Sequence, residues 1–138
     1  MKVILYTCVL AELQKSKSDP QVVEYINQVN DEDLFLSVIT IGEITEGILL
    51  LNKSKKKNRL IQWLVTIEQV YGKRILPIDP ETVQFWGELT ANAQKKGIII
   101  PAADGLIAAT ALQHGLHLIT RNKSDFSNTG ALVINPWK

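Results

Sequence analysis

The stretch that decides the fold is residues 3–10, VILYTCVL, in which a strand pattern gives way to a helix pattern. The short apolar run at residues 3–5 predicts a buried strand, and the apolar residues from Val9 onward predict a helix. Three residues lie at the junction between them, namely Tyr6, Thr7 and Cys8. Ligands of open α/β sheets bind beyond the carboxyl ends of the strands. The junction is therefore a candidate functional position, although it contains no charged side chain.

Strand-like and helix-like segments alternate along the rest of the chain. Further buried strands are predicted at residues 34–38, 75–78, 116–120 and 132–134. The helices between them are predicted to begin at Asp19-Pro20 and to span residues 40–51, 60–70, 80–97 and 104–113. Four or five short apolar strands separated by helices predict an α/β fold, with a parallel sheet covered by helices on both faces. We expect residues 1–138 to form a single domain.

The bulk composition is typical of a globular protein that contains no membrane span. Hydrophobic residues make up 46% of the 138 positions and charged residues 21%, and the formal net charge is +1. The single cysteine, Cys8, excludes an internal disulfide and fits a reducing compartment. No apolar run approaches the length of a transmembrane helix, and the N-terminus lacks the layout of a signal peptide. We therefore expect a cytoplasmic protein without a membrane partner.

Polar side chains follow several of the predicted strands, where the carboxyl ends of parallel strands share one edge of the sheet. Besides the first junction, these residues are Ser37, Thr40, Glu43, Asp104, Thr120, Arg121, Asn122, Ser124 and Asp125. The three carboxylates come without a set of histidines or cysteines at metal-ligand spacing. Acidic oxygens of this kind suit a hard cation such as Mg²⁺ or Mn²⁺, which activates water in phosphodiester cleavage.

Each acidic residue also has a purely structural explanation. Glu43 has the spacing of a capping-box partner for Thr40, an arrangement that contributes about 0.5–2 kcal/mol to a helix start. Asp104 complements the dipole of its helix, typically by about 0.3–1 kcal/mol, and Asp125 suits a turn. Taken singly, these explanations are favoured, whereas the joint position of the acids favours a metal site. The basic run at residues 53–59 fits a solvated loop and helix start better than a phosphate contact.

Four longer motifs resemble those of the PIN-domain ribonucleases, specifically the VapC-type toxins of bacterial toxin–antitoxin pairs. The motifs are LSVITIGEI at 36–44, RILPID at 74–79, PAADGLIAATA at 101–111 and LITRNKSDF at 118–126. They occur in the family's order, and the resemblance extends from the first strand to Asn135-Pro136-Trp137.

The resemblance implies a three-layer α/β/α sandwich and an endoribonuclease that depends on Mg²⁺ or Mn²⁺. It also implies an RNA substrate, a homodimer, and an antitoxin protein that occupies the active-site groove. Position by position, Glu43 and Asp104 match metal-binding acids, and Asn122 and Asp125 match the loop that completes the catalytic set. The remaining polar residues that match secondary positions around the site are Thr7, Ser37, Thr40, Thr120 and Arg121.

The first strand departs from the family pattern, which reads leucine, aspartate, threonine, asparagine. This chain reads Leu5-Tyr6-Thr7-Cys8, so Tyr6 stands at the position of a metal-binding aspartate. A tyrosine is neutral near pH 7, because its unperturbed pKa is about 10, and it is much larger than aspartate. We therefore expect a ribonuclease by descent whose activity is impaired or absent.

Three origins of this departure stay open: natural divergence to a partner-binding protein, selected or engineered inactivation, and residual cleavage with one metal held by the remaining acids. A catalytically silent binding module that pairs with an antitoxin is the alternative function. A nucleotide-binding domain is poorly supported, because neither Gly-x-Gly-x-x-Gly after the first strand nor a Walker-type Gly-Lys-Ser/Thr is present.

Overall fold

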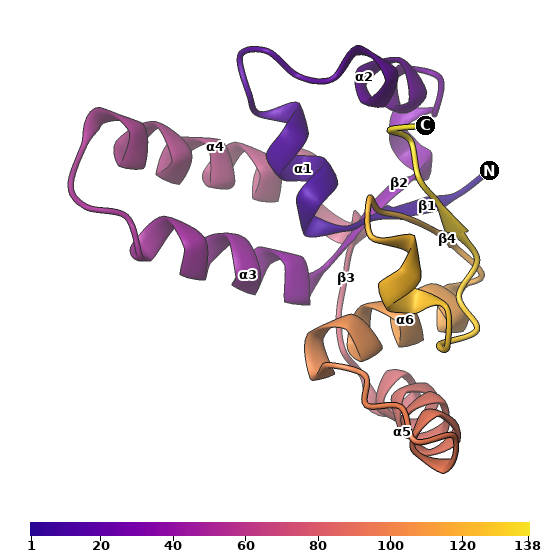
Figure 1. Ribbon diagram of the computed structural model, residues 1–138. Coiled ribbons are helices and arrows are strands. Elements are labelled where there is room, and N and C mark those ends of the chain that lie inside the picture. The colour runs from indigo at the N-terminus through magenta and orange to yellow at the C-terminus, as the bar shows by residue number, and fades with distance from the viewer.

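The computed structural model describes residues 1–138 and contains one five-stranded parallel sheet (Figure 1). The strands are β1 (Val3–Leu5), β2 (Leu34–Ser37), β3 (Ile75–Leu76), β4 (His117–Ile119) and β5 (Val133–Ile134). Their spatial order is β3-β2-β1-β4-β5, and every neighbouring pair is parallel. The N-terminal strand is therefore the centre of the sheet, and all of its residues are fully buried.

The two faces of the sheet have separate hydrophobic cores, which confirms the predicted three layers. Because successive side chains of a strand point to opposite faces, Val3 and Leu5 belong to one core and Ile4 to the other. The first core is covered by α1 (Thr7–Leu13), α2 (Pro20–Asn27), α3 (Val38–Leu49) and α4 (Lys55–Tyr71). The second is covered by α5 (Pro80–Lys95) and α6 (Ala102–His114). The buried alanines of α6 belong to the same core as Ile4 of β1 and Leu118 of β4. None of these helices is long and apolar enough to cross a membrane.

Most helix boundaries follow from local signals in the sequence. Asp19 and Asp79 are the N-caps of α2 and α5, each followed by proline at the first helical position, as predicted. Gly115 ends α6 in the left-handed conformation with φ 65°, which glycine adopts without strain. Short 3₁₀ turns precede β2 and β3 at Asp31–Asp33 and Gly72–Arg74, and a third, at Lys123–Phe126, follows β4.

The predicted start of α3 at Thr40 was wrong. The helix begins at Val38, and the N-cap is Ser37, whose hydroxyl accepts a hydrogen bond of 3.0 Å from the backbone N–H of Ile39. The reason is that β2 runs into α3 without a loop, so the last strand residue is also the cap. Thr40 and Glu43 therefore do not form a capping box, and the Glu43 carboxylate is available for contacts outside its own helix.

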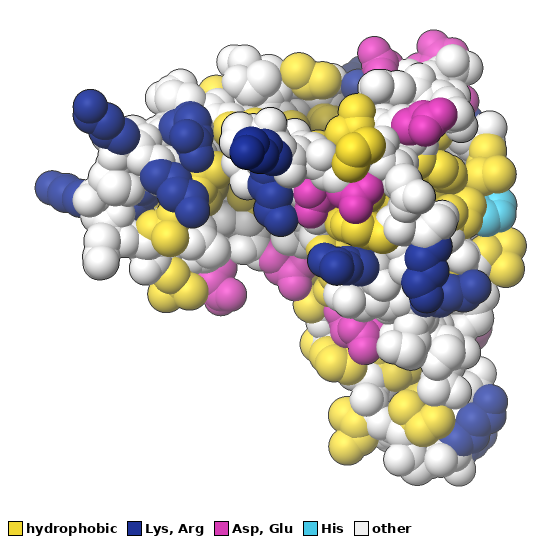
Figure 2. Space-filling view, turned by 45° about the horizontal axis from the view of Figure 1, so that its top comes forward, with side chains coloured by type: hydrophobic (Ala, Val, Ile, Leu, Met, Phe, Trp, Pro, Cys, Tyr) yellow, Lys and Arg dark blue, Asp and Glu magenta, His cyan; other side chains and the backbone are white.

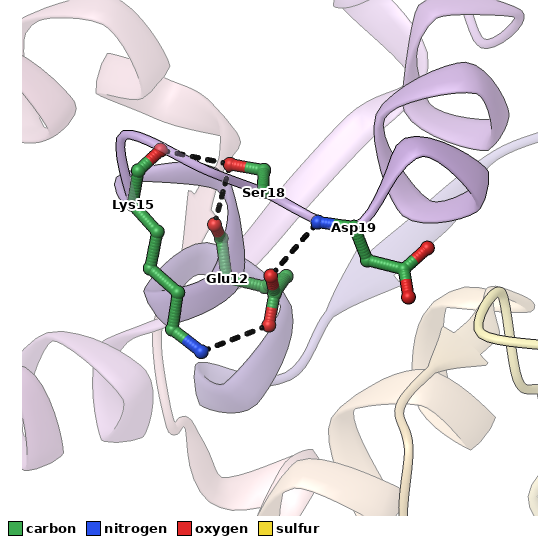
Figure 3. Close-up of polar contacts among 4 residues, drawn as sticks. All are labelled: Glu12, Lys15, Ser18 and Asp19. Carbon is green, nitrogen blue, oxygen red and sulfur yellow. Dashed lines mark hydrogen bonds and ion pairs between the residues drawn. The ribbon is translucent and has the colours of Figure 1, made fainter.

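A buried carboxylate fixes the connection between α1 and α2 (Figure 3). Glu12 is only 7% exposed, and its side chain accepts a 2.9 Å hydrogen bond from the backbone N–H of Asp19. Lys15 forms an ion pair of 3.1 Å with the same carboxylate, and Ser18 donates to the Glu12 backbone carbonyl at 2.8 Å. These contacts hold the turn at the end of α1 in a defined position relative to the sheet.

Candidate functional site

The central feature of the site is Tyr6, which lies between β1 and α1. Its backbone is extended and it is the N-terminal flanking residue of α1. The half-buried ring packs edge-on against Phe126, with ring centroids 5.4 Å apart and planes at 80°. Its hydroxyl donates a hydrogen bond to Oδ1 of Asp104, which belongs to the first turn of α6. Two predicted site residues that are 98 positions apart in the sequence are therefore in direct contact.

The environment of Tyr6 keeps its phenol protonated. Burial is the largest cause that raises the pKa of Tyr6 well above its ordinary value, and the hydrogen bond to Asp104 raises it further. The negative charges of Asp104 and Glu43 act in the same direction. Tyr6 is consequently a neutral donor at physiological pH, and it engages one oxygen of the Asp104 carboxylate.

A second contact joins the first residue of α1 to α3. The Thr7 hydroxyl donates a hydrogen bond of 2.6 Å to Oε1 of Glu43 and also lies 3.3 Å from the buried Thr40 hydroxyl. Since one hydroxyl carries one proton, the shorter contact to the charged oxygen is the stronger of the two. The structure thus brings together Thr7, Thr40 and Glu43, as the sequence predicted for this edge of the sheet.

The polar residues after β4 have mixed positions. The buried Thr120 hydroxyl lies 3.5 Å from the Cys8 sulfur and accepts a 3.2 Å hydrogen bond from the backbone N–H of Asn122. The guanidinium of Arg121 lies over the ring of Trp137, 5.4 Å from its centroid. Arg121 is thus held at the C-terminal segment. Ser37, predicted as a secondary polar residue of the site, is fully buried and is the N-cap of α3.

The remaining carboxylate, Asp125, shares a hollow of about 300 Å³ with Asp104. Other residues that line it include Ile100, Ser124 and Asn128, but Glu43 does not. No group of three or more His, Cys, Asp or Glu side chains is close enough together to hold a metal ion. As the side chains lie, the residues of the site do not fit a divalent cation, and the Tyr6 phenol engages one oxygen of Asp104.

Sequence reasoning missed the role of Phe126 in this arrangement. Phe126 is 1% exposed and supplies the apolar wall against which the Tyr6 ring rests. A usable signal was present, since a half-buried tyrosine needs both an apolar surface for its ring and a partner for its hydroxyl. The LITRNKSDF motif that carries Asp125 ends in this aromatic residue.

Comparisons with known proteins agree with this architecture. The family model described as "PIN domain" matches residues 3–132. The chain is 37% identical over 136 residues to "Toxin FitB" of Neisseria gonorrhoeae, covering 98% of each chain. It is 35% identical over 140 residues to "VapC ribonuclease Y4jK" of Sinorhizobium fredii, covering 99% of this chain and 98% of the relative.

A solved structure shows the same fold over the full length. The structure described as "FitAB bound to IR36 DNA fragment" contains a chain that superimposes with a TM-score of 0.92 at 35% identity, covering 99% of this chain and 96% of that one. The matched length, the shared sheet and the order of the motifs lead to one assignment. The chain belongs to the PIN-domain family, among the VapC-type ribonuclease toxins of toxin–antitoxin systems.

Proposed function

We propose that this chain is the toxin partner of a toxin–antitoxin pair and an endoribonuclease by descent whose cleavage of RNA is impaired by Tyr6. The observation that carries the proposal is the hydrogen bond from the Tyr6 hydroxyl to Asp104. It occupies a carboxylate that the family resemblance assigns to the metal. The proposal keeps the partners expected from the sequence, namely an RNA substrate, a cognate antitoxin and a second copy of the chain in a homodimer, in the cytoplasm.

The chemistry of the donor set explains why the substitution is severe. Mg²⁺ requires near-octahedral oxygen coordination and is usually held through carboxylates and waters, and Mn²⁺ prefers similar ligands. The resemblance assigns this role to Glu43, Asp104 and Asp125, with Asn122 beside them. In this chain Asp104 is hydrogen-bonded to a phenol and Glu43 to Thr7, so two of the three acids already have donors. The proposed cofactor therefore has neither its first-strand carboxylate nor a free Asp104.

The second candidate function is a catalytically silent module that binds an antitoxin, and the hydrogen bonds of Tyr6 and Thr7 to the acidic residues favour it. The hydrogen bonds of Tyr6 and Thr7 satisfy the acidic groups without any cation, so the site is stable as a purely protein structure. The two candidates share a fold and a partner, and they differ only in whether any RNA turnover remains.

A paired assay separates these possibilities. The wild-type chain, Tyr6→Asp and the double variant Tyr6→Asp/Cys8→Asn are each incubated with RNA and Mn²⁺, with EDTA as the metal-free control. We expect cleavage in the variants that restore the aspartate and little in the wild type, because the restored carboxylate both supplies a ligand and releases Asp104. Adding Asp104→Asn to the double variant is the matched control and removes the cleavage.

Two results would contradict the proposal. If the wild type cleaves RNA as fast as the double variant in a reaction that EDTA abolishes, Tyr6 does not impair the site. If no variant cleaves at saturating Mn²⁺, the endoribonuclease assignment fails for this chain and the silent binding module is favoured.

A further inference from the structure

A basic hollow lies between the end of α1 and the start of α4. It has a volume of about 500 Å³, and its lining consists of Gln14, Lys15, Ser16, Lys17, Lys56 and Arg59. None of these residues is hydrophobic or acidic, and the four cations are all exposed. Figure 2 shows Lys and Arg side chains gathered over the end of the molecule where α3 and α4 meet. We call this feature the basic hollow.

The charges of the basic hollow are almost entirely unbalanced within the protein. The single ion pair of the whole structure joins Lys15 to Glu12, so Lys17, Lys56 and Arg59 have no carboxylate partner within 4.0 Å. The first turn of α4 contains no acidic residue and carries Lys55, Lys56 and Lys57 instead. Since the amino end of a helix has a partial positive charge, these cations oppose the helix dipole. The arrangement destabilises the free protein locally, and an anion in the basic hollow relieves that repulsion.

The basic hollow is connected to the candidate site by a single short helix. Thr7, at the start of α1, contacts Glu43, and Gln14 and Lys15 follow directly after the seven residues of the helix. Seven helical residues span roughly 10 Å. The buried Glu12 carboxylate fixes this turn and holds the Lys15 ammonium in place (Figure 3). A chain of phosphates that passes the site can therefore reach the basic hollow within a few nucleotides.

We propose that the basic hollow binds the phosphate backbone of RNA next to the candidate site, an inference that rests on the proposed function. The chemistry of the lining favours a backbone contact. Lys and Arg side chains without apolar or aromatic neighbours bind phosphates and make no sequence-specific contacts with the bases. A peptide partner, in contrast, is held mainly by hydrophobic side chains in pockets, and no hydrophobic residue lines the basic hollow. The contact thus supplies affinity and position, without sequence specificity.

The test measures binding of a fluorescent single-stranded RNA oligonucleotide to the full-length wild-type chain by anisotropy, in EDTA so that no cleavage occurs. The variant Lys56→Gln/Arg59→Gln removes two cations from the basic hollow. The matched control, Lys95→Gln/Lys96→Gln, removes two exposed cations at the end of α5. We expect the first variant to bind roughly tenfold more weakly, with a salt dependence lower by about 1.4 in log–log slope, and the control to bind like the wild type. Circular dichroism and thermal melts establish that all three proteins are folded.

Several results would overturn the inference. An unchanged affinity in Lys56→Gln/Arg59→Gln would show that the basic hollow does not bind RNA. An equal loss in the control variant would show that RNA responds only to the general charge of the protein. A polyglutamate peptide that binds the wild type as tightly as the RNA, with the same loss in the variant, would assign the basic hollow to an acidic peptide.

The same substitutions in the Tyr6→Asp/Cys8→Asn background separate this inference from the proposed function. We expect KM for RNA to rise with kcat unchanged, because the basic hollow contributes binding that is equal in ground state and transition state. A fall in kcat alone would contradict a backbone-binding role. If that background shows no cleavage at all while the anisotropy difference persists, the proposed enzyme fails and the RNA-binding surface stands.

Discussion

Replacement of Tyr6 by phenylalanine isolates the contribution of a single oxygen atom to this site. Tyr6→Phe keeps the aromatic ring and its edge-on contact with Phe126, and it removes only the hydroxyl that donates to Asp104. The carboxylate of Asp104 then loses its only side-chain hydrogen-bond donor in the structure. We therefore expect the variant to fold with an unchanged architecture and a lower stability.

The magnitude follows from the type of hydrogen bond and its exposure. A hydrogen bond to a charged group is worth about 1.5–3 kcal/mol. Both partners are only half-buried, so water replaces part of the lost interaction and the lower end of the range applies. For a chain of this length, a loss of about 1.5 kcal/mol corresponds to a fall in Tm of roughly 5 °C.

The pH dependence of this effect has a defined sign. Burial, followed by the hydrogen bond to Asp104, raises the pKa of Tyr6 in the folded protein above its unfolded value of about 10. The stability linked to the protonated phenol is therefore fully present below about pH 10 and is lost as the pH rises beyond it. The difference in Tm between wild type and Tyr6→Phe should be constant around neutrality and should narrow in alkaline solution.

The assay is thermal unfolding followed by circular dichroism between pH 7 and pH 11. Tyr25→Phe is the matched control, because Tyr25 is also half-buried, its pKa is also raised by burial, and its hydroxyl makes no hydrogen bond in the structure. We expect a clear fall in Tm for the first variant and little change for the second at neutral pH. A Tyr6→Phe variant that is as stable as the wild type would refute the view that the phenol stabilises the acidic site.

Three further predictions concern the metal, the helix packing and acid stability. Tyr6→Asp adds a fourth negative charge to those of Glu43, Asp104 and Asp125, so its Tm should fall in EDTA and recover with Mn²⁺ while the wild type responds to neither; equal responses would contradict this. Gly105→Ala places a Cβ 3.0 Å from Cδ1 of Trp86, an overpacking that should cost about 1–3 kcal/mol in urea unfolding, and an unchanged midpoint would show that the indole moves freely. The pKa of Glu12 is held below its ordinary value, chiefly by the hydrogen bond from the backbone N–H of Asp19. The wild type should therefore have a higher Tm than Glu12→Gln at pH 7, and this difference should disappear as the pH falls below about 4. A difference that does not depend on pH would exclude the charge of Glu12 as its cause.

Much of the fold could be predicted from the sequence, because the deciding signals are local. Apolar runs bounded by polar residues located the five strands, and the Asp-Pro pairs at 19–20 and 79–80 located two helix starts. The start of α3 could not be predicted in the same way. Both Ser37 and Thr40 are acceptable caps by residue type, and the choice depends on where the β2 ladder ends, which is a property of the sheet.

The sequence predicts which residues belong to the site better than it predicts the contacts between them. The structure confirms that Asp104 lies in the first turn of a helix, and it brings that residue next to Tyr6. That Tyr6 replaces an acidic position stays a prediction. The sequence did not indicate that the phenol donates to the Asp104 carboxylate, because this contact depends on the wall formed by Phe126 and on the angle between α6 and the sheet. The basic run at 53–59 indicates a loop and a helix start, and the sequence does not show that the start of α4 lies near Lys15 and Lys17, because that depends on where the fold places the turn after α1.

The central position of β1 has a consequence for synthesis of the protein on the ribosome. The ribosome makes β1 well before β4, the neighbouring strand in which Leu118 pairs with Ile4. Such long-range pairing makes folding slow compared with a helical bundle, because the entropy of closing a long loop is lost before the contacts between the distant segments form. A nascent fragment that lacks β4 therefore has no assembled junction at Tyr6, and one edge of β1 remains unpaired until β4 has been made.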